Sequence, residues 1–127
     1  MKRAIFLVPL LLVAGCGAVG GREQAASATA LRLLDAVAAG DGAGACAVLA
    51  PDTASEVSES DCPSAILGEN LPAPGTVVEA DVYGQWAQVR LTGDTVFLAV
   101  FPGGWRVVAA GCAAQGDRPY DCAVSGG

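Results

Sequence analysis

The sequence predicts an α+β domain whose helices come before an antiparallel sheet. Apolar residues recur at helical spacing in the first half of the chain, and they alternate with polar residues after the proline-containing segment 71–75. An even number of cysteines follows the N-terminal segment, which is typical of small exported domains held by disulfides. We therefore expect one domain in which the helices pack on one face of an antiparallel meander.

The N-terminus has the pattern of an export signal. Lys2 and Arg3 precede an apolar run over residues 4–13, which is too short to cross a hydrocarbon core of ~30 Å as a helix. The run ends in Val13-Ala14-Gly15-Cys16, which resembles a lipobox, where small residues fit the signal peptidase and the thiol accepts a diacylglyceryl group. The alternative is an ordinary secretory signal in which a cysteine happens to lie at the cleavage point.

The lipobox divides the chain into three parts. We expect residues 1–15 to be a lipoprotein signal peptide, Cys16 to carry the lipid, and residues 16–23 to form a flexible tether. Residues 24–127 then form a single domain, since the 112 residues that follow cleavage suffice for one core. The predicted location is the outer face of the cytoplasmic membrane, where acyl chains such as palmitate anchor the protein.

The charge of the mature part limits its partners. Loss of Lys2 and Arg3 lowers the seven basic residues to five against 13 acidic ones, so the net charge becomes −8. This balance argues against nucleic acid, because neutralising phosphates requires a basic surface. The alternative, which we favour, is that the acidic charge only keeps the protein soluble and does not select a partner.

The four cysteines after Cys16 are predicted to form two disulfides. Zinc is disfavoured because the chain has no histidine and no C-x-x-C pair. Sequence alone leaves three connectivities open, but the positions of the cysteines favour two short loops. We expect Cys46–Cys62 to connect two helices and Cys112–Cys122 to fold the C-terminal tail against the sheet.

Three helices are expected. The first runs over about 23–39, with an apolar face and with Arg32 and Asp35 on the opposite side. Asp41 caps the second, which Pro51 closes, and Ser60 or Asp61 caps a third that ends near residue 67. The apolar face of the first helix comprises Ala26, Ala30, Leu33, Leu34 and Val37.

Four strands follow, joined by tight glycine-containing turns. They cover residues 78–83, 86–91, 95–101 and 105–110. Val78, Ala80 and Val82 are expected on the core face of the first strand. The third strand is apolar on both faces, so we place it in the middle of the sheet.

Several motifs resemble a known family. Ala36-Val-Ala-Ala-Gly-Asp41, Leu49-Ala-Pro-Asp52 and Gly104-Trp-Arg-Val-Val108 resemble the first helices and the last strand of NTF2-like (SnoaL-like, cystatin-type) proteins. Gly111-Cys112 and Asp117-Arg-Pro-Tyr-Asp-Cys122 resemble small lipoproteins of high-GC Gram-positive (actinobacterial) bacteria. The resemblance implies a curved sheet that forms a cone, whose mouth holds a small ligand in some members and an active site in others.

Candidate site residues lie on the predicted strands. Glu79, Asp81 and Tyr83 share one strand face, and Asp94 lies at a turn, so a carboxylate could act as a base if it were buried. The alternative is an ordinary solvent face, which we favour because acids alternating with apolar residues are typical of a half-buried strand. The candidate pocket residues are aromatic: Trp86, Phe97, Phe101 and Trp105. The alternative, which we favour, is that these rings pack in the core or against neighbouring strands.

Two function classes remain open. The first is a non-catalytic binding or interaction module of the cell envelope, and the second is an isomerase or hydrolase of the SnoaL/NTF2-like type that uses a pocket carboxylate. We favour the module because the chain has no histidine and no paired catalytic groups. We expect no catalytic residue, metal or cofactor. The expected partners are the membrane, through the lipid anchor, and a small apolar ligand or an envelope protein.

Overall fold

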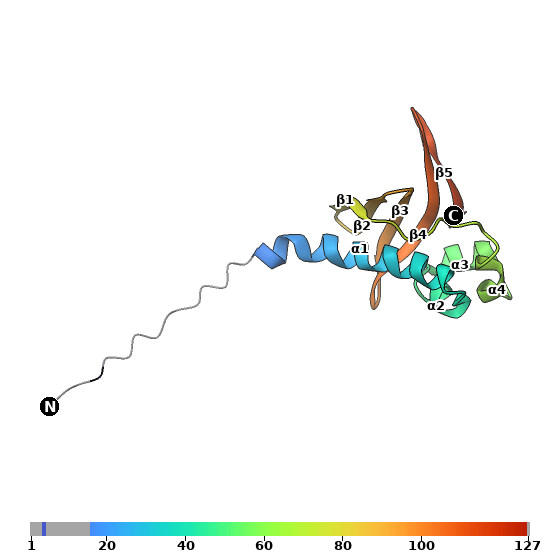
Figure 1. The fold of residues 1–127 in the computed structure, drawn as a ribbon, viewed down its shortest axis with the longest axis horizontal. Helices are drawn as coiled ribbons and strands as arrows, with labels where there is room; N and C mark the ends of the chain where they lie inside the picture. Colours follow the sequence, from blue (N-terminus) through green and yellow to red (C-terminus); the bar gives the residue numbers. More distant parts are fainter. Residues whose placement is uncertain (1–3, 5–15, 127) are drawn as a thin grey trace.

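The computed structural model describes residue 4 and residues 16–126, so the predicted signal peptide lies outside the described residues except for Ala4. The fold is α+β, as predicted, with helices followed by five antiparallel strands (Figure 1). The elements are α1 (Cys16–Ala38), α2 (Gly42–Ala47), α3 (Pro51–Val57), α4 (Cys62–Ile66), β1 (Val77–Tyr83), β2 (Trp86–Leu91), β3 (Asp94–Phe101), β4 (Gly104–Gln115) and β5 (Arg118–Ser125).

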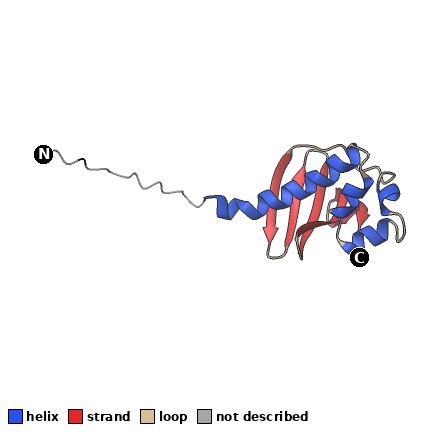
Figure 2. Cartoon of the chain, turned by 90° about the horizontal axis from the view of Figure 1, so that it is seen from below, coloured by secondary structure: helices blue, strands red, loops and turns tan. Residues whose placement is uncertain are grey.

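Helix α1 crosses one face of the sheet (Figure 2). Four of its predicted core residues, Ala26, Ala30, Leu33 and Leu34, are fully buried, and Val37 packs beside them. The helix starts earlier than predicted, so the expected tether is helical over its whole length. Glycines within that stretch weaken a helix by about 1 kcal/mol each but do not stop it, and no proline interrupts it.

The short helices differ from the prediction at Pro51. Asp41 caps α2 as expected, with its Oδ1 accepting a hydrogen bond from the Gly44 backbone N–H at 2.9 Å. Pro51, however, begins α3 instead of only closing the helix before it, so a helix that was not predicted lies between the second and third predicted ones. Proline fits the first helical turn, where its missing N–H is not needed, and Asp52 complements the positive end of the helix.

The third predicted helix is α4, and Asp61 provides its cap. The Asp61 side chain accepts from the Ser64 backbone N–H, and Pro63 lies in the first turn.

Between α2 and α3 the chain is extended and forms a parallel bridge from Leu49 to Val107 of β4. The segment between the two helices thereby extends the sheet beside the first half of β4.

The sheet has a fifth strand that we did not predict. Its order is β1-β2-β3-β4-β5, with every neighbouring pair antiparallel and β3 in the middle, as expected for its two apolar faces. The C-terminal tail does fold back, but it does so as β5, paired along an extended β4. The strand was missed because this segment shows little apolar alternation and contains Pro119, which only an edge strand tolerates.

The helix-facing side of the sheet is filled by one core. Ala80 and Val82 of β1 pack against this core, as predicted. Val78 does not: a bulge turns it outward, where it is 56% exposed, and Val77 packs against the core in its place. The largest fully buried side chains come from both layers: Leu33, Leu34, Leu49, Ile66, Val89, Val96, Leu98, Val107 and Thr53. The interior where the resemblance implies a cone is therefore occupied by side chains of the chain itself.

The hairpin of β4 and β5 rises away from the helices and curves the sheet (Figure 1). Two features allow the bend. A register shift in the β3–β4 ladder lies between the partners of Phe97 and Leu98, and Gly111 adopts a φ of +65°. A Cβ at Gly111 would also lie 2.8 Å from that of Ala123, so glycine is required there for both conformation and space.

Candidate functional site

The side of the sheet that faces away from α1 is called the open face here. Alternation identifies its residues, because Ala87, Val89 and Leu91 of β2 are buried against the helices. Their neighbours in sequence must point the other way, together with their partners on β1 and β3. The open face therefore carries Glu79, Asp81, Tyr83, Trp86, Gln88, Arg90, Thr95, Phe97, Ala99 and Phe101.

Two large aromatic side chains lie next to each other at one end of the open face. Tyr83 and Trp86 are directly opposite in the β1–β2 ladder, on either side of the turn that joins these strands. They are 60% and 57% exposed, respectively. Directly paired residues have Cβ atoms about 5 Å apart, so the two exposed side chains start next to each other on this face.

A second aromatic contact connects the hairpin to the middle of the sheet. The ring of Tyr120 on β5 meets Phe97 on β3 edge to face, with centroids 5.1 Å apart. The Tyr120 hydroxyl also lies 3.5 Å from the Gln88 amide nitrogen on β2. Tyr120 of β5 therefore reaches across β3 on the open face to Gln88 of β2, which makes this face concave.

The four predicted pocket residues do not form one pocket. Trp86, Phe97 and Phe101 belong to the open face, whereas Trp105 packs on the helix side of β4. The Arg22 guanidinium of α1 lies over the Trp105 ring, 5.4 Å from its centroid, and donates a hydrogen bond to the Gly84 carbonyl. None of the four lines either of the two cavities found in the described part of the chain.

Sequence reasoning missed two aromatic residues of the open face. Tyr83 was considered only as a partner of the strand carboxylates, although its exposed position opposite Trp86 follows from the two-residue turn between them. Tyr120 lies in the tail whose pairing was not predicted as a strand, so nothing in the sequence pattern placed it beside Phe97.

The candidate carboxylates on β1 share one face, as expected, but one of them is paired. Glu79 accepts a hydrogen bond from the guanidinium of its cross-strand partner Arg90 at 2.5 Å, and both side chains are half exposed. Asp81 is half-buried and lies opposite Gln88. These groups supply hydrogen-bonding capacity around the aromatic pair.

Asp94 is buried, but its carboxylate serves the backbone. It accepts hydrogen bonds from the N–H groups of Thr95, Gly111 and Cys112, at 2.7, 3.1 and 2.9 Å. The residue is 6% exposed. Through these three hydrogen bonds Asp94 holds β4 against the start of β3 where the hairpin bends.

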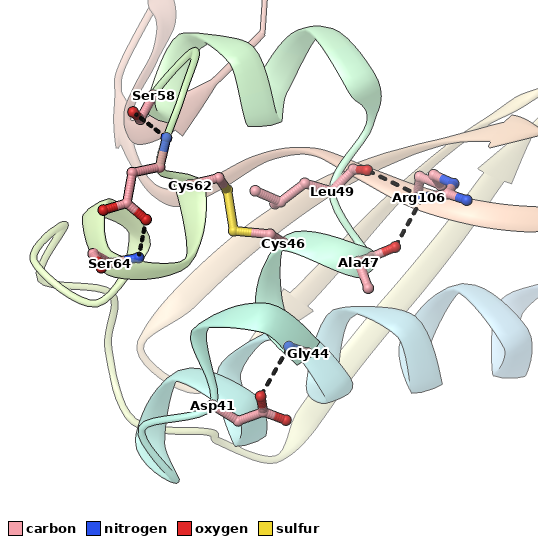
Figure 3. The surroundings of a disulfide bond; sticks show 10 residues. Asp41, Gly44, Cys46, Ala47, Leu49, Ser58, Cys62, Ser64 and Arg106 are labelled. Atoms are coloured by element: carbon pink, nitrogen blue, oxygen red, sulfur yellow. Dashed lines mark hydrogen bonds between the residues drawn. A yellow bond between two sulfur atoms is a disulfide. The ribbon is translucent and has the colours of Figure 1, made fainter.

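Both disulfides join the pairs that the sequence analysis favoured. Cys46–Cys62 connects α2 to α4, and Figure 3 shows it beside Arg106, which donates to the carbonyls of Ala47 and Leu49. The second bridge connects Cys112 to Cys122, which are direct partners in the β4–β5 ladder.

Two of the cavities on the surface of the described residues lie away from these side chains. One, of about 280 Å³, is lined by residues of α3, Glu69 and β5. The larger, of about 520 Å³, is a groove between the flank of α1 and the first half of β1. Within residues 16–126, acidic and cysteine side chains do not gather in threes as a metal site would require.

Comparison with known proteins gave no match: the chain matches no family, no curated protein and no solved structure. Among the described helices, none combines the length and the apolar composition needed to cross a bilayer.

Proposed function

We propose that this protein is a lipid-anchored, extracytoplasmic binding module of the cell envelope, and that the open face is its contact surface. The exposed pair of Tyr83 and Trp86 carries the proposal. Aromatic rings of this size contribute a large apolar area when a partner covers them, and tyrosine and tryptophan are enriched where proteins bind other molecules. Their polar atoms stay available for hydrogen bonds at the border.

The surroundings of the pair also support a binding surface. On the same face of β1 and β2, the next cross-strand pair after Tyr83 and Trp86 is Asp81 with Gln88. The pair after that is Glu79 with Arg90. An apolar centre with polar groups around it is the usual anatomy of a protein contact surface. The concavity produced by Tyr120 over Phe97 would partly enclose whatever lies on it.

Catalysis of the isomerase or hydrolase type is the second candidate, and the packing favours it less. The space between helices and sheet is filled by residues such as Leu33, Val96 and Leu98. The buried carboxylate, Asp94, is occupied by three backbone donors. The succession of helices and a curved antiparallel meander supports assigning the fold to the NTF2-like group as part of this proposal.

The anchor is tested at Cys16. Metabolic labelling with a palmitate analogue should tag the wild-type protein, and Cys16→Ser should abolish both the label and recovery in the membrane fraction, because each buried CH₂ of an acyl chain contributes about 0.8 kcal/mol. Membrane recovery of the unlabelled variant would contradict the lipoprotein assignment.

The contact surface is tested by crosslinking in living cells. A photoreactive amino acid replaces Trp86 in one variant and Ser55, which is exposed on α3, in the control. We expect a discrete crosslinked species from position 86 that disappears on Tyr83→Ala, and none from position 55. Equal crosslinking from both positions, or none from position 86, would contradict a binding role for the open face.

A further inference from the structure

The groove between α1 and β1 contains a carboxylate oxygen without a partner. Its walls are the flank of α1, with Glu23, Ser27 and Leu31, and the start of β1, with Val77 and Val78. Oε2 of Glu23 is buried, and no hydrogen-bond donor reaches it within the described residues. Buried polar atoms nearly always have a partner, since an unpaired one is costly. Glu23 as a whole is only half-buried, so rotation of its carboxylate brings an oxygen within reach of a donor that enters the groove.

The nearest basic side chain in sequence does not serve Glu23. Arg22, its neighbour on α1, donates to the Gly84 carbonyl and lies over the Trp105 ring. Arg90 of β2 pairs with Glu79, which is the β1 carboxylate that lines the groove. Both nearby guanidinium groups are therefore engaged, and the groove remains negative next to an apolar wall.

The shape of the groove favours an extended chain over a small enclosed molecule. The groove is open to solvent and lies beside β1, which is the outermost strand and pairs only with β2 in the described part of the sheet. An outer strand leaves alternate backbone N–H and C=O groups free to pair with an added strand. Val78, which bulges out of the ladder and is 56% exposed, offers an apolar contact to that strand.

We propose that this groove binds an extended segment of a partner protein, in which apolar residues alternate with lysine or arginine. The apolar side chains of the segment contact Leu31, Val77 and Val78. One cationic side chain donates to Oε2 of Glu23, and the net charge of −8 on the part of the chain after residue 15 attracts a basic partner. The site lies between α1 and the outer edge of β1. It shares only Glu79 with the open face, and it does not depend on the lipid anchor.

The probe is a fluorescein-labelled peptide of alternating valine and lysine, whose binding to the purified full chain is measured by fluorescence anisotropy. Glu23→Gln keeps the shape of the side chain and removes its charge. Glu59→Gln is the matched control, because it makes the same change in net charge at an exposed position between α3 and α4.

We expect Glu23→Gln to raise the Kd about tenfold, because the amide oxygen still accepts a hydrogen bond but no longer carries the charge that strengthens it. Glu59→Gln should leave the Kd unchanged. Trp86→Ala should also leave it unchanged, which separates this site from the open face. A peptide of alternating valine and glutamate should not bind.

Three results would overturn the proposal. The first is that the valine–lysine peptide fails to bind the wild-type chain. The second is an equal loss of affinity in the two glutamate variants. The third is that Trp86→Ala weakens binding as much as Glu23→Gln does. Melting curves of Glu23→Gln verify that it is folded, and Val78→Lys, at an exposed position, gives an independent block of the groove that should weaken binding similarly.

Discussion

The two disulfides connect regions of very different construction. Cys46–Cys62 joins α2 and α4, which have six and five residues and are too short to be stable on their own. Cys112–Cys122 joins two strands already paired on both sides of the bridge, from Ala109–Ser125 to Gln115–Arg118. The first disulfide thus holds α2 and α4 together, and we call these two helices the helical corner. The second joins strands that the hydrogen bonds of the β4–β5 ladder already hold together.

The helical corner also supports the sheet, which gives its bridge wider consequences. The extended segment that follows α2 pairs with β4 through two hydrogen bonds, from Ala50 N–H to the Val107 carbonyl and from Val107 N–H to that of Val48. Both bridge cysteines pack against the main core. By contrast, residues 113–121 at the tip of the hairpin are all exposed, so the tip can open without disturbing the core.

The largest effect is expected from removal of the corner bridge. Cys46→Ser or Cys62→Ser should lower the free energy of unfolding by about 3 kcal/mol, the chain-entropy estimate for a loop of this length. The double variant should be little worse than either single one, because the second substitution removes no further bond. Urea unfolding monitored by tryptophan fluorescence measures this loss, and additive effects of the two substitutions would contradict the bridge.

The contact between α2 and α4 should be almost as sensitive. A Cβ on Gly42 would lie 1.9 Å from the carbonyl oxygen of Pro63, so Gly42→Ala forces two backbone segments apart. We expect a loss of about 2 kcal/mol from this overpacking. Gly20→Ala is the control: its Cβ meets nothing within 4 Å, and alanine favours a helix, so this variant should be neutral or slightly more stable. Equal melting temperatures for the two variants would mean that the corner is not tightly packed.

The contrast between the regions also explains what could be predicted from the sequence. Helix α1 and strands β2 and β3 have clear periodicity, because one face of each packs on the core, and their positions were predicted to within a few residues except for the start of α1. The elements missed, α3 and β5, are short or mostly exposed, so burial imposes no pattern on them. Local signals such as Pro51 are compatible with either the end or the start of a helix.

The candidate site was only partly predictable, for a related reason. The shared face of Glu79, Asp81 and Tyr83 follows from strand alternation alone. The contact of Tyr120 with Phe97 depends on the curvature of the sheet, and the role of Asp94 depends on the bend at Gly111. Contacts that arise from the arrangement of distant strands leave no periodic signal in the sequence.

The hairpin should depend on Asp94 more than on its own disulfide. Asp94→Asn replaces one acceptor oxygen by an N–H₂ group that faces backbone donors, so we expect a loss of about 2 kcal/mol, close to the penalty for a buried unpaired group. Asp81→Asn, at a half-buried position of the open face, should change stability by less than about 0.5 kcal/mol. Thermal unfolding of the two variants tests this difference, which equal losses would contradict.

The smallest effect is expected from the hairpin bridge. The double variant Cys112→Ser/Cys122→Ser removes a loop closure of 10 residues, for which the chain-entropy estimate is nearly as large as for the corner. The native state, however, recovers part of that loss, because the exposed tip gains freedom while the ladder and Asp94 keep the base of the hairpin in place. We expect about 1 kcal/mol by urea unfolding, with faster hydrogen exchange confined to residues 113–120. A loss as large as that of the corresponding corner variant, or faster exchange throughout β3 and β4, would mean that this bridge also holds the core.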